Sequence, residues 1–167
     1  RSKVGLACLE PNSPTDIAIF SFDDEFLYAG FTCQKIKGHF YNVRKLARPR
    51  DANLERRDRI EFAIDLDRDY RSVNRFVVDH RGWVHESCGG SAGWNPDWYV
   101  SHSENETSWT VEFAIPLEHI TPGKIEPGTT WAFQVARRAF DLSNLWDDTA
   151  NARPATSEHA IQNGLET

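Results

Sequence analysis

The segment SWTVEFAIPLEHI, residues 108–120, alternates apolar side chains with others and then reaches a proline. One parity is entirely apolar and consists of Trp109, Val111, Phe113 and Ile115. This period of two is typical of a β-strand with one buried face. Pro116 cannot donate a ladder hydrogen bond, so the strand should end there, and residues 117–120 should form a short helical turn or a loop.

Comparable strand patterns recur along the chain, with turn residues between them and without long helical patterns. They cover residues 17–22, 26–33, 59–66, 75–79, 83–87, 97–103 and 131–140. A final edge strand is expected within residues 141–167. About eight strands of this kind predict an all-β fold, an antiparallel two-sheet β-sandwich.

Matched parity in three of these strands predicts one hydrophobic core between the sheets. Its expected members are Ile60, Phe62, Ile64, Val111, Phe113, Ile115, Trp131, Phe133 and Val135. Trp109 shares this parity and is also expected to be a packing residue. The basic stretch 35–57 lacks a strand pattern, and we interpret it as a long solvated loop.

Length and composition narrow the functional class. The chain has 167 residues, 19.1 kDa, a net charge of -6 and a pI near 5.5. We expect one domain spanning residues 1–167, and the acidic balance argues against a nucleic-acid partner. No apolar run is long enough for a membrane span, and no signal-peptide pattern is present. Because the chain starts at Arg1 and lacks Met, we expect it to be a piece of a longer protein.

Patterns for metal and catalytic chemistry are weak. Cys8, Cys33 and Cys88 have no metal-binding spacing, and the sequence leaves open one disulfide with a free thiol or three buried thiols. The DLDRD stretch, residues 65–69, begins like a calcium loop but lacks the later glycine and glutamate of an EF-hand. We therefore predict no cofactor, with a structural calcium ion at these carboxylates as the alternative. No zinc, serine-nucleophile, phosphate or dinucleotide motif appears.

Several motifs in this order are similar to those of a known family. The segments DDEFLYAGF, DRIEFAIDLD, FVVDHRG, SWTVEFAIPLEHI and GTTWAFQVARR, followed by a later tryptophan, resemble the family-9 carbohydrate-binding modules and their relatives. The resemblance covers roughly residues 17–166. It implies a jelly-roll-like β-sandwich that binds sugars without cleaving them, as a module of a secreted or surface polysaccharide-active protein. An extracellular, periplasmic or cell-surface location, a carbohydrate ligand and flanking domains in the parent protein are implied with it.

Residue chemistry points to candidate ligand-binding side chains. Pyranose rings pack their C–H faces on aromatic rings, while their hydroxyl groups need polar partners around the rim. The GWNPDW loop places Trp94 and Trp98 beside amide and carboxylate groups. Trp146 matches the late tryptophan that the family resemblance associates with sugar stacking, and Arg137 matches the arginine at the end of the Trp-led strand.

Polar residues on the parity opposite the core supply the other half of the expected site. They are Glu61, Glu112, Gln134 and Arg138. We predict that Glu61, Glu112 and either Arg137 or Arg138 meet on one sheet face, with Trp146 as the stacking platform. The alternative to a sugar-binding face is a purely structural salt-bridge network on the outside of a sheet.

Three other functions stay open at this point. A haem-binding electron-transfer domain on a related sandwich would need a pair of histidine ligands, because the chain has no Met. A glycoside hydrolase would need two carboxylates about 5 to 9 Å apart across a cleft. A structural or protein-interaction sandwich would need neither.

Overall fold

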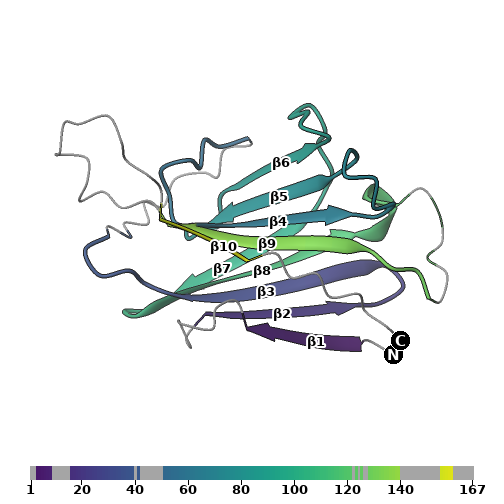
Figure 1. The fold of residues 1–167 in the computed structure, drawn as a ribbon. Coiled ribbons are helices and arrows are strands. Elements are labelled where there is room, and N and C mark those ends of the chain that lie inside the picture. The colour runs from purple at the N-terminus through teal and green to yellow at the C-terminus, as the bar shows by residue number, and fades with distance from the viewer. Residues whose placement is uncertain are drawn as a thin grey trace.

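The computed structural model describes residues 3–8, 16–39, 41, 51–121, 123, 125, 128–139 and 155–159. These residues form two antiparallel five-stranded sheets stacked as a β-sandwich (Figure 1). The all-β, antiparallel two-sheet sandwich expected from the strand patterns, jelly-roll-like as the family resemblance implies, is therefore confirmed. No helix of the described residues has the length and apolar character needed to cross a membrane.

The first sheet has the strand order β1-β2-β3-β8-β7. Its strands are β1 (Lys3–Cys8), β2 (Ile17–Phe22), β3 (Phe26–Gln34), β8 (Ser108–Pro116) and β7 (Tyr99–Glu104). Strands β2 and β3 form a hairpin, in which Phe22 faces Leu27. Asp23 closes the turn, because its Oδ1 accepts hydrogen bonds from the backbone N–H groups of Glu25 (2.9 Å) and Phe26 (2.8 Å).

The second sheet has the strand order β10-β9-β4-β5-β6. Its strands are β10 (Ala155–His159), β9 (Ala132–Ala139), β4 (Arg59–Asp65), β5 (Asn74–Asp79) and β6 (Val84–Cys88). Strand β10 is the final edge strand that was expected within residues 141–167. Strand β1, at the opposite end of the chain, was not predicted.

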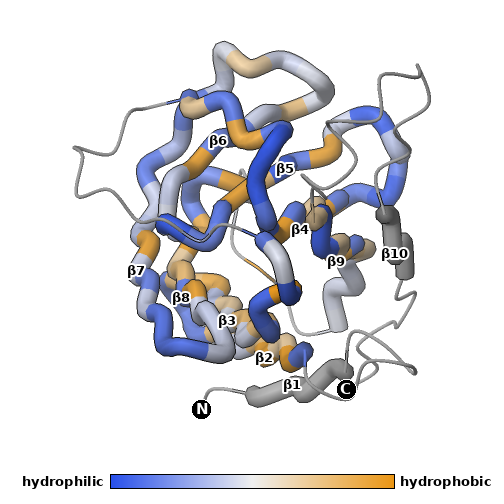
Figure 2. The backbone as a smooth tube through the Cα atoms, turned by 90° about the vertical axis from the view of Figure 1, so that its left-hand side faces the viewer, coloured by the Kyte–Doolittle hydropathy of each residue, from blue (hydrophilic) through white to orange (hydrophobic). Residues whose placement is uncertain are grey.

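Strand β8 behaves as its sequence indicates. It ends at Pro116, and the 3-10 helix η1 (Leu117–His119) follows directly. Figure 2 shows that β3 and β8 carry both hydrophobic and hydrophilic positions. Trp109, Val111, Phe113 and Ile115 are all buried, so the apolar parity of the segment faces the core.

One hydrophobic core fills the space between the sheets. Of its nine expected members, seven are fully buried: Ile60, Phe62, Ile64, Val111, Phe113, Ile115 and Val135. Trp131 and Phe133 are partly buried and pack against the same cluster. Phe62 of the second sheet lies 5.7 Å from Phe20 and 5.8 Å from Phe113 of the first sheet, measured between ring centroids.

The interpretation of residues 35–57 as a solvated loop is partly wrong. Ala52 and Leu54 are buried against Val77 on the outer face of the second sheet, and Trp83 packs against the same group. The reason is that β5 carries the apolar Val77 on its outward parity, between Arg75 and Asp79, and this side chain needs a cover. The intervening residues 40 and 42–50 lie outside the described part of the chain.

Candidate functional site

The outer face of the second sheet gathers most of the polar residues expected to form a site. In the strand register, Arg59 faces Arg138, and Ala63 lies between Gln134 and Arg75. Glu61 is two residues from Arg59 along β4, so its side chain emerges on the same face. Antiparallel pairing of β9, β4 and β5 therefore brings one carboxylate, one amide and several guanidinium groups together.

Glu61 is the centre of this group. Its Oε1 accepts a hydrogen bond of 2.9 Å from Arg59 Nε and is 2.8 Å from the second terminal nitrogen of the same guanidinium. Its Oε2 pairs with Arg75 and accepts a longer hydrogen bond of 3.4 Å from Arg138 Nε. The remaining nitrogen of Arg59 donates to the carbonyl oxygen of Glu55 at 2.8 Å, which ties the site to the preceding loop.

The charged neighbours keep Glu61 ionised. Burial on its own would raise the pKa of this carboxyl group, but the hydrogen bonds and positive charges of Arg75 and Arg59 outweigh it and lower the pKa. A lowered pKa suits a hydrogen-bond acceptor and is unsuited to a general acid, which must hold its proton near neutral pH.

Solvent reaches the group mainly through its basic members. The Glu61 side chain is only 8% exposed, whereas that of Arg75 is 48% exposed. Gln134 of β9 is also exposed. It is separated from Arg75 of β5 by strand β4, which lies between these two strands. The face thus presents guanidinium and amide groups to solvent over a fixed carboxylate, and such groups are suited to hydrogen bonding with hydroxyl groups.

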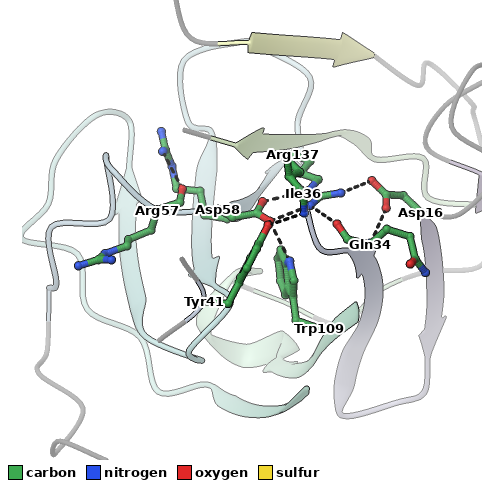
Figure 3. Close-up of polar contacts among 9 residues, drawn as sticks. Asp16, Gln34, Ile36, Tyr41, Arg57, Asp58, Trp109 and Arg137 are labelled. Atoms are coloured by element: carbon green, nitrogen blue, oxygen red, sulfur yellow. Dashed lines mark hydrogen bonds and ion pairs between the residues drawn. The ribbon is translucent and has the colours of Figure 1, made fainter. Parts of the chain in front are cut away.

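Arg137 points the other way, between the two sheets (Figure 3). Its guanidinium donates from Nε to Asp58 Oδ1 at 3.0 Å and from a terminal nitrogen to Asp58 Oδ2 at 2.7 Å. The other terminal nitrogen donates to Asp16 Oδ2 at 2.7 Å. The terminal nitrogen that contacts Asp58 also donates to the backbone oxygen of Gln34 at 2.6 Å. Consecutive residues of a strand face opposite sides, so Arg138 belongs to the outer face and Arg137 to the interior.

Asp58 is the shared acceptor of this interior network. Its Oδ2 also accepts from Trp109 Nε1 at 2.9 Å and from the Tyr41 hydroxyl at 2.8 Å (Figure 3). Burial would lower the pKa of Arg137, but the hydrogen bonds and negative charge of Asp58 outweigh it and raise that pKa. Burial together with Asp58 also raises the pKa of Tyr41. The network links the two sheets and holds Arg137 away from solvent.

The two tryptophans of the GWNPDW loop are packed against the core. Trp98 is 9% exposed, lies 5.0 Å from Phe76 between ring centroids, and donates from Nε1 to Glu86 at 3.4 Å. Trp94 is partly buried, with its ring centroid 5.4 Å from that of Phe76. Trp146 lies outside the described residues, so the expected stacking platform stays a prediction.

The expectation that Glu112 joins Glu61 is wrong. Glu112 is on β8 of the first sheet and pairs with Gly30 and Ser101, whereas Glu61 is on β4 of the second sheet. Both side chains point away from the core, so they emerge on opposite faces of the sandwich. Parity correctly predicts that both point outward, but it does not tell which sheet a strand joins.

Sequence reasoning missed the roles of Arg59 and Arg75 at Glu61, and those of Asp16 and Asp58 at Arg137. A signal for Arg75 is available, because it is a charged residue on the outward parity of its strand, next to the apolar Phe76. No local pattern identifies Asp16 or Asp58, because each lies just before a strand and finds its partner far along the chain.

Three carboxylates, at the end of β4 and in the loop that follows it, come close enough to hold a metal ion. Oxygen atoms of Asp65, Asp67 and Asp69 lie within 4.8 Å of one another. Their carboxylates are also used locally, because Asp65 accepts the backbone N–H groups of Arg68 and Tyr70, at 2.8 Å each. Of the cysteines, Cys33 and Cys88 are free thiols.

No family model matches this chain, and no curated protein matches it. Solved structures do share its fold. A family-9 carbohydrate-binding module from Caldicellulosiruptor kristjanssonii, in complex with cellotriose, is 14% identical with a TM-score of 0.52, over 84% of this chain and 67% of that chain. A structure from the same organism in complex with glucose is 15% identical with a TM-score of 0.50, over 84% and 69% of the two chains.

A candidate carbohydrate-binding protein from Bacteroides uniformis is similar to the same extent. It is 12% identical with a TM-score of 0.54, over 83% of this chain and 71% of that chain. At these identities the likeness concerns the fold, and the fold of this chain is therefore that of the family-9 carbohydrate-binding modules.

Proposed function

We propose that this chain is a noncatalytic carbohydrate-binding domain whose polar contacts come from the outer face of the second sheet around Glu61. The observation that carries the proposal is the convergence of Arg59, Arg75 and Arg138 on Glu61, beside the exposed Gln134, on the sandwich fold of known sugar binders. Guanidinium groups donate to sugar hydroxyl oxygens, and an ionised carboxylate accepts from sugar O–H groups.

The stacking surface of this proposal is Trp146, as the family resemblance implies. Trp94, which is partly buried, is the candidate second wall, and Trp98 would have to leave its core position to serve as one. Arg138 replaces Arg137 among the hydrogen-bonding partners, because Arg137 is held inside by Asp16 and Asp58.

Binding without cleavage is supported by the charge state of Glu61. A hydrolase needs a carboxylic acid with a raised pKa beside a second carboxylate. Glu61 has a lowered pKa and is surrounded by arginines. We extend the proposal to the setting of the chain, as a module of a polysaccharide-active protein located outside the cytoplasm, where polysaccharides accumulate.

Calorimetric titration with soluble cello-oligosaccharides tests the proposal. Trp146→Ala should weaken binding by roughly tenfold to a hundredfold, because a buried ring face contributes on the order of 1 to 3 kcal/mol. Arg75→Gln should weaken it by about tenfold through lost hydrogen bonds. Arg71→Gln, the same charge change in the exposed loop after β4, is the matched control and should bind like the parent.

Each competing reading has its own outcome. Release of reducing ends during incubation would contradict binding without cleavage, and a Soret band in the purified protein would favour the haem alternative. Silence across a broad set of plant and microbial polysaccharides would favour a structural or protein-binding role.

A further inference from the structure

The outer face of the first sheet, opposite the candidate site, carries a groove of about 530 Å³. Its lining comes from β2, β3, β7 and β8 and includes Ile19, Tyr28, Gly30, Tyr99 and Glu112. This volume lies within the range of about 300 to 1,000 Å³ that is typical of small-molecule sites. Of the residues that the sequence placed in a sugar site, its lining includes Glu112.

The strand register explains why the face is hollow. Gly30 lies in β3 between Ile19 of β2 and Glu112 of β8, and Ala114 lies between Tyr28 and Tyr99 in the neighbouring row. Residues with little or no side chain thus form the floor, and larger residues form the walls. A Cβ added at Gly30 would lie 3.9 Å from Glu112 Cγ, which is an ordinary van der Waals contact, so there is open space above this glycine.

Aromatic rings border one end of the groove. The Phe26 ring centroid is 5.8 Å from that of Tyr28 and 6.1 Å from that of Tyr99. Tyr99 is 63% exposed, and Ile19, which also lines the groove, is 42% exposed, so apolar surface gathers along it. Tyr28 is held in place, because its hydroxyl donates to Asp23 Oδ2 at 2.9 Å.

Glu112 is the one charged side chain among the outward positions that these four strands align. Those positions form three rows, each read in the order β2, β3, β8 and β7. The rows are Ile17, Thr32, Thr110 and Ser103; Ile19, Gly30, Glu112 and Ser101; and Ser21, Tyr28, Ala114 and Tyr99. Glu112 is exposed, and it makes no hydrogen bond or ion pair with any described residue. The groove therefore has a negative charge that no described residue neutralises, beside aromatic rings and serine hydroxyls.

These features together select the chemistry of an occupant. Aromatic faces take up the C–H face of a sugar ring and also attract cations, and a carboxylate pairs with an ammonium group. Hydroxyl groups of Ser21 and Ser101 can exchange hydrogen bonds with sugar hydroxyls. We infer that the groove binds an amino sugar, with its ring against Tyr99 and its ammonium group on Glu112.

Titration with glucosamine oligomers at pH 5.5, where the amine is protonated, tests this inference. Oligomers of N-acetylglucosamine with the same length are the reference ligand, because acetylation removes the charge and keeps the ring. Glucosamine oligomers should bind about tenfold or more tightly than the acetylated oligomers, since a charge-assisted contact is lost on acetylation. Equal affinities, or no binding of glucosamine oligomers at millimolar concentration, would overturn the inference.

Variants identify the face involved. Glu112→Gln should remove the preference for glucosamine, while Glu118→Gln, the same charge change on the exposed side of η1, should keep it. Tyr99→Ala should weaken both ligands by about tenfold through the lost ring face. The inference fails if Arg75→Gln abolishes glucosamine binding and Glu112→Gln does not.

The proposed function is tested independently of this groove. Binding of cello-oligosaccharides should be reduced by Arg75→Gln and should not change in Glu112→Gln. Loss of one activity with retention of the other therefore shows which face has been misassigned.

Discussion

Arginines on the two sides of the second sheet, Arg137 of β9 and Arg75 of β5, have different environments at the scale of single residues. Arg137 pairs with two largely buried carboxylates, Asp16 and Asp58, while Arg75 on the outer face is 48% exposed. Arg137→Met should lower the free energy of unfolding by about 3 to 5 kcal/mol, because it leaves buried charges unpaired. Arg75→Met should cost about 1 kcal/mol or less. Urea denaturation measures both, and similar losses would contradict the interior role of Arg137.

His80 is a second residue whose environment has a measurable consequence. It is 2% exposed, and neither ring nitrogen has a hydrogen-bond partner among the described residues. Burial lowers its pKa below the ordinary 6.5, and the opposing charges of Asp79 and Asp58 do not compensate. The folded state therefore keeps His80 neutral at a pH where the unfolded chain already binds a proton.

The expected pH dependence follows from that sign. The contribution of His80 to stability is fully present above pH 6.5 and is lost as the pH falls from there toward the folded-state pKa. The slope is at most about 1.4 kcal/mol per pH unit. His80→Phe should reduce the loss of stability between pH 7.5 and 5.5, measured as the shift of the denaturation midpoint. His119→Phe, at an exposed position, should leave that pH-dependent shift unchanged. An unchanged slope in His80→Phe would show that another group is responsible.

The segment before β4 acts as a cover at the scale of structural elements. Leu54 is 4% exposed and packs on Val77, and the backbone oxygens of Leu54 and Glu55 accept hydrogen bonds from Arg59. Leu54→Ala should lower the free energy of unfolding by about 2 to 3 kcal/mol, near the low end for buried leucines because the contact is one-sided. Ile17→Ala, at a 44% exposed position, should change it by about 0.5 kcal/mol or less. Equal effects would mean that the segment does not cover the sheet.

The whole molecule depends on one core shared by both sheets. Phe62 lies in it and contacts aromatic rings of both sheets, including Phe113 at 5.8 Å and Phe133 at 6.2 Å. Phe62→Ala should cost about 3 to 5 kcal/mol and shift a single transition, with coincident tryptophan fluorescence and circular dichroism curves. Tyr99→Ala should leave the transition within about 0.5 kcal/mol of the parent. Two separate transitions in the Phe62→Ala variant would contradict a single cooperative core.

The sequence alone determines which side of each strand is apolar and where the main strands lie. Alternation in residues 109–115 correctly placed Trp109 and Phe113 in the core and turned Glu112 away from it. Alternation in residues 59–66 likewise turned Glu61 to the outer face, because side-chain direction in a strand depends only on local parity. The edge strand β1 was missed, and the cover provided by Leu54 was mistaken for a solvated loop. The pairing of β1 with β2 and the packing of Leu54 on Val77 both depend on contacts with other segments of the chain, which a local pattern does not show.

Only the tertiary structure decides which outward residues become neighbours. Pairing of β9, β4 and β5 joins Glu61 to Arg138 and Arg75, and membership of the other sheet puts Glu112 on the opposite face. Asp58 meets Arg137 across 79 residues of chain, and no local pattern encodes that contact. Strand pairing is a choice among distant segments that the packing of the whole core settles, so the location of a site on a sheet follows from the fold and not from the motif.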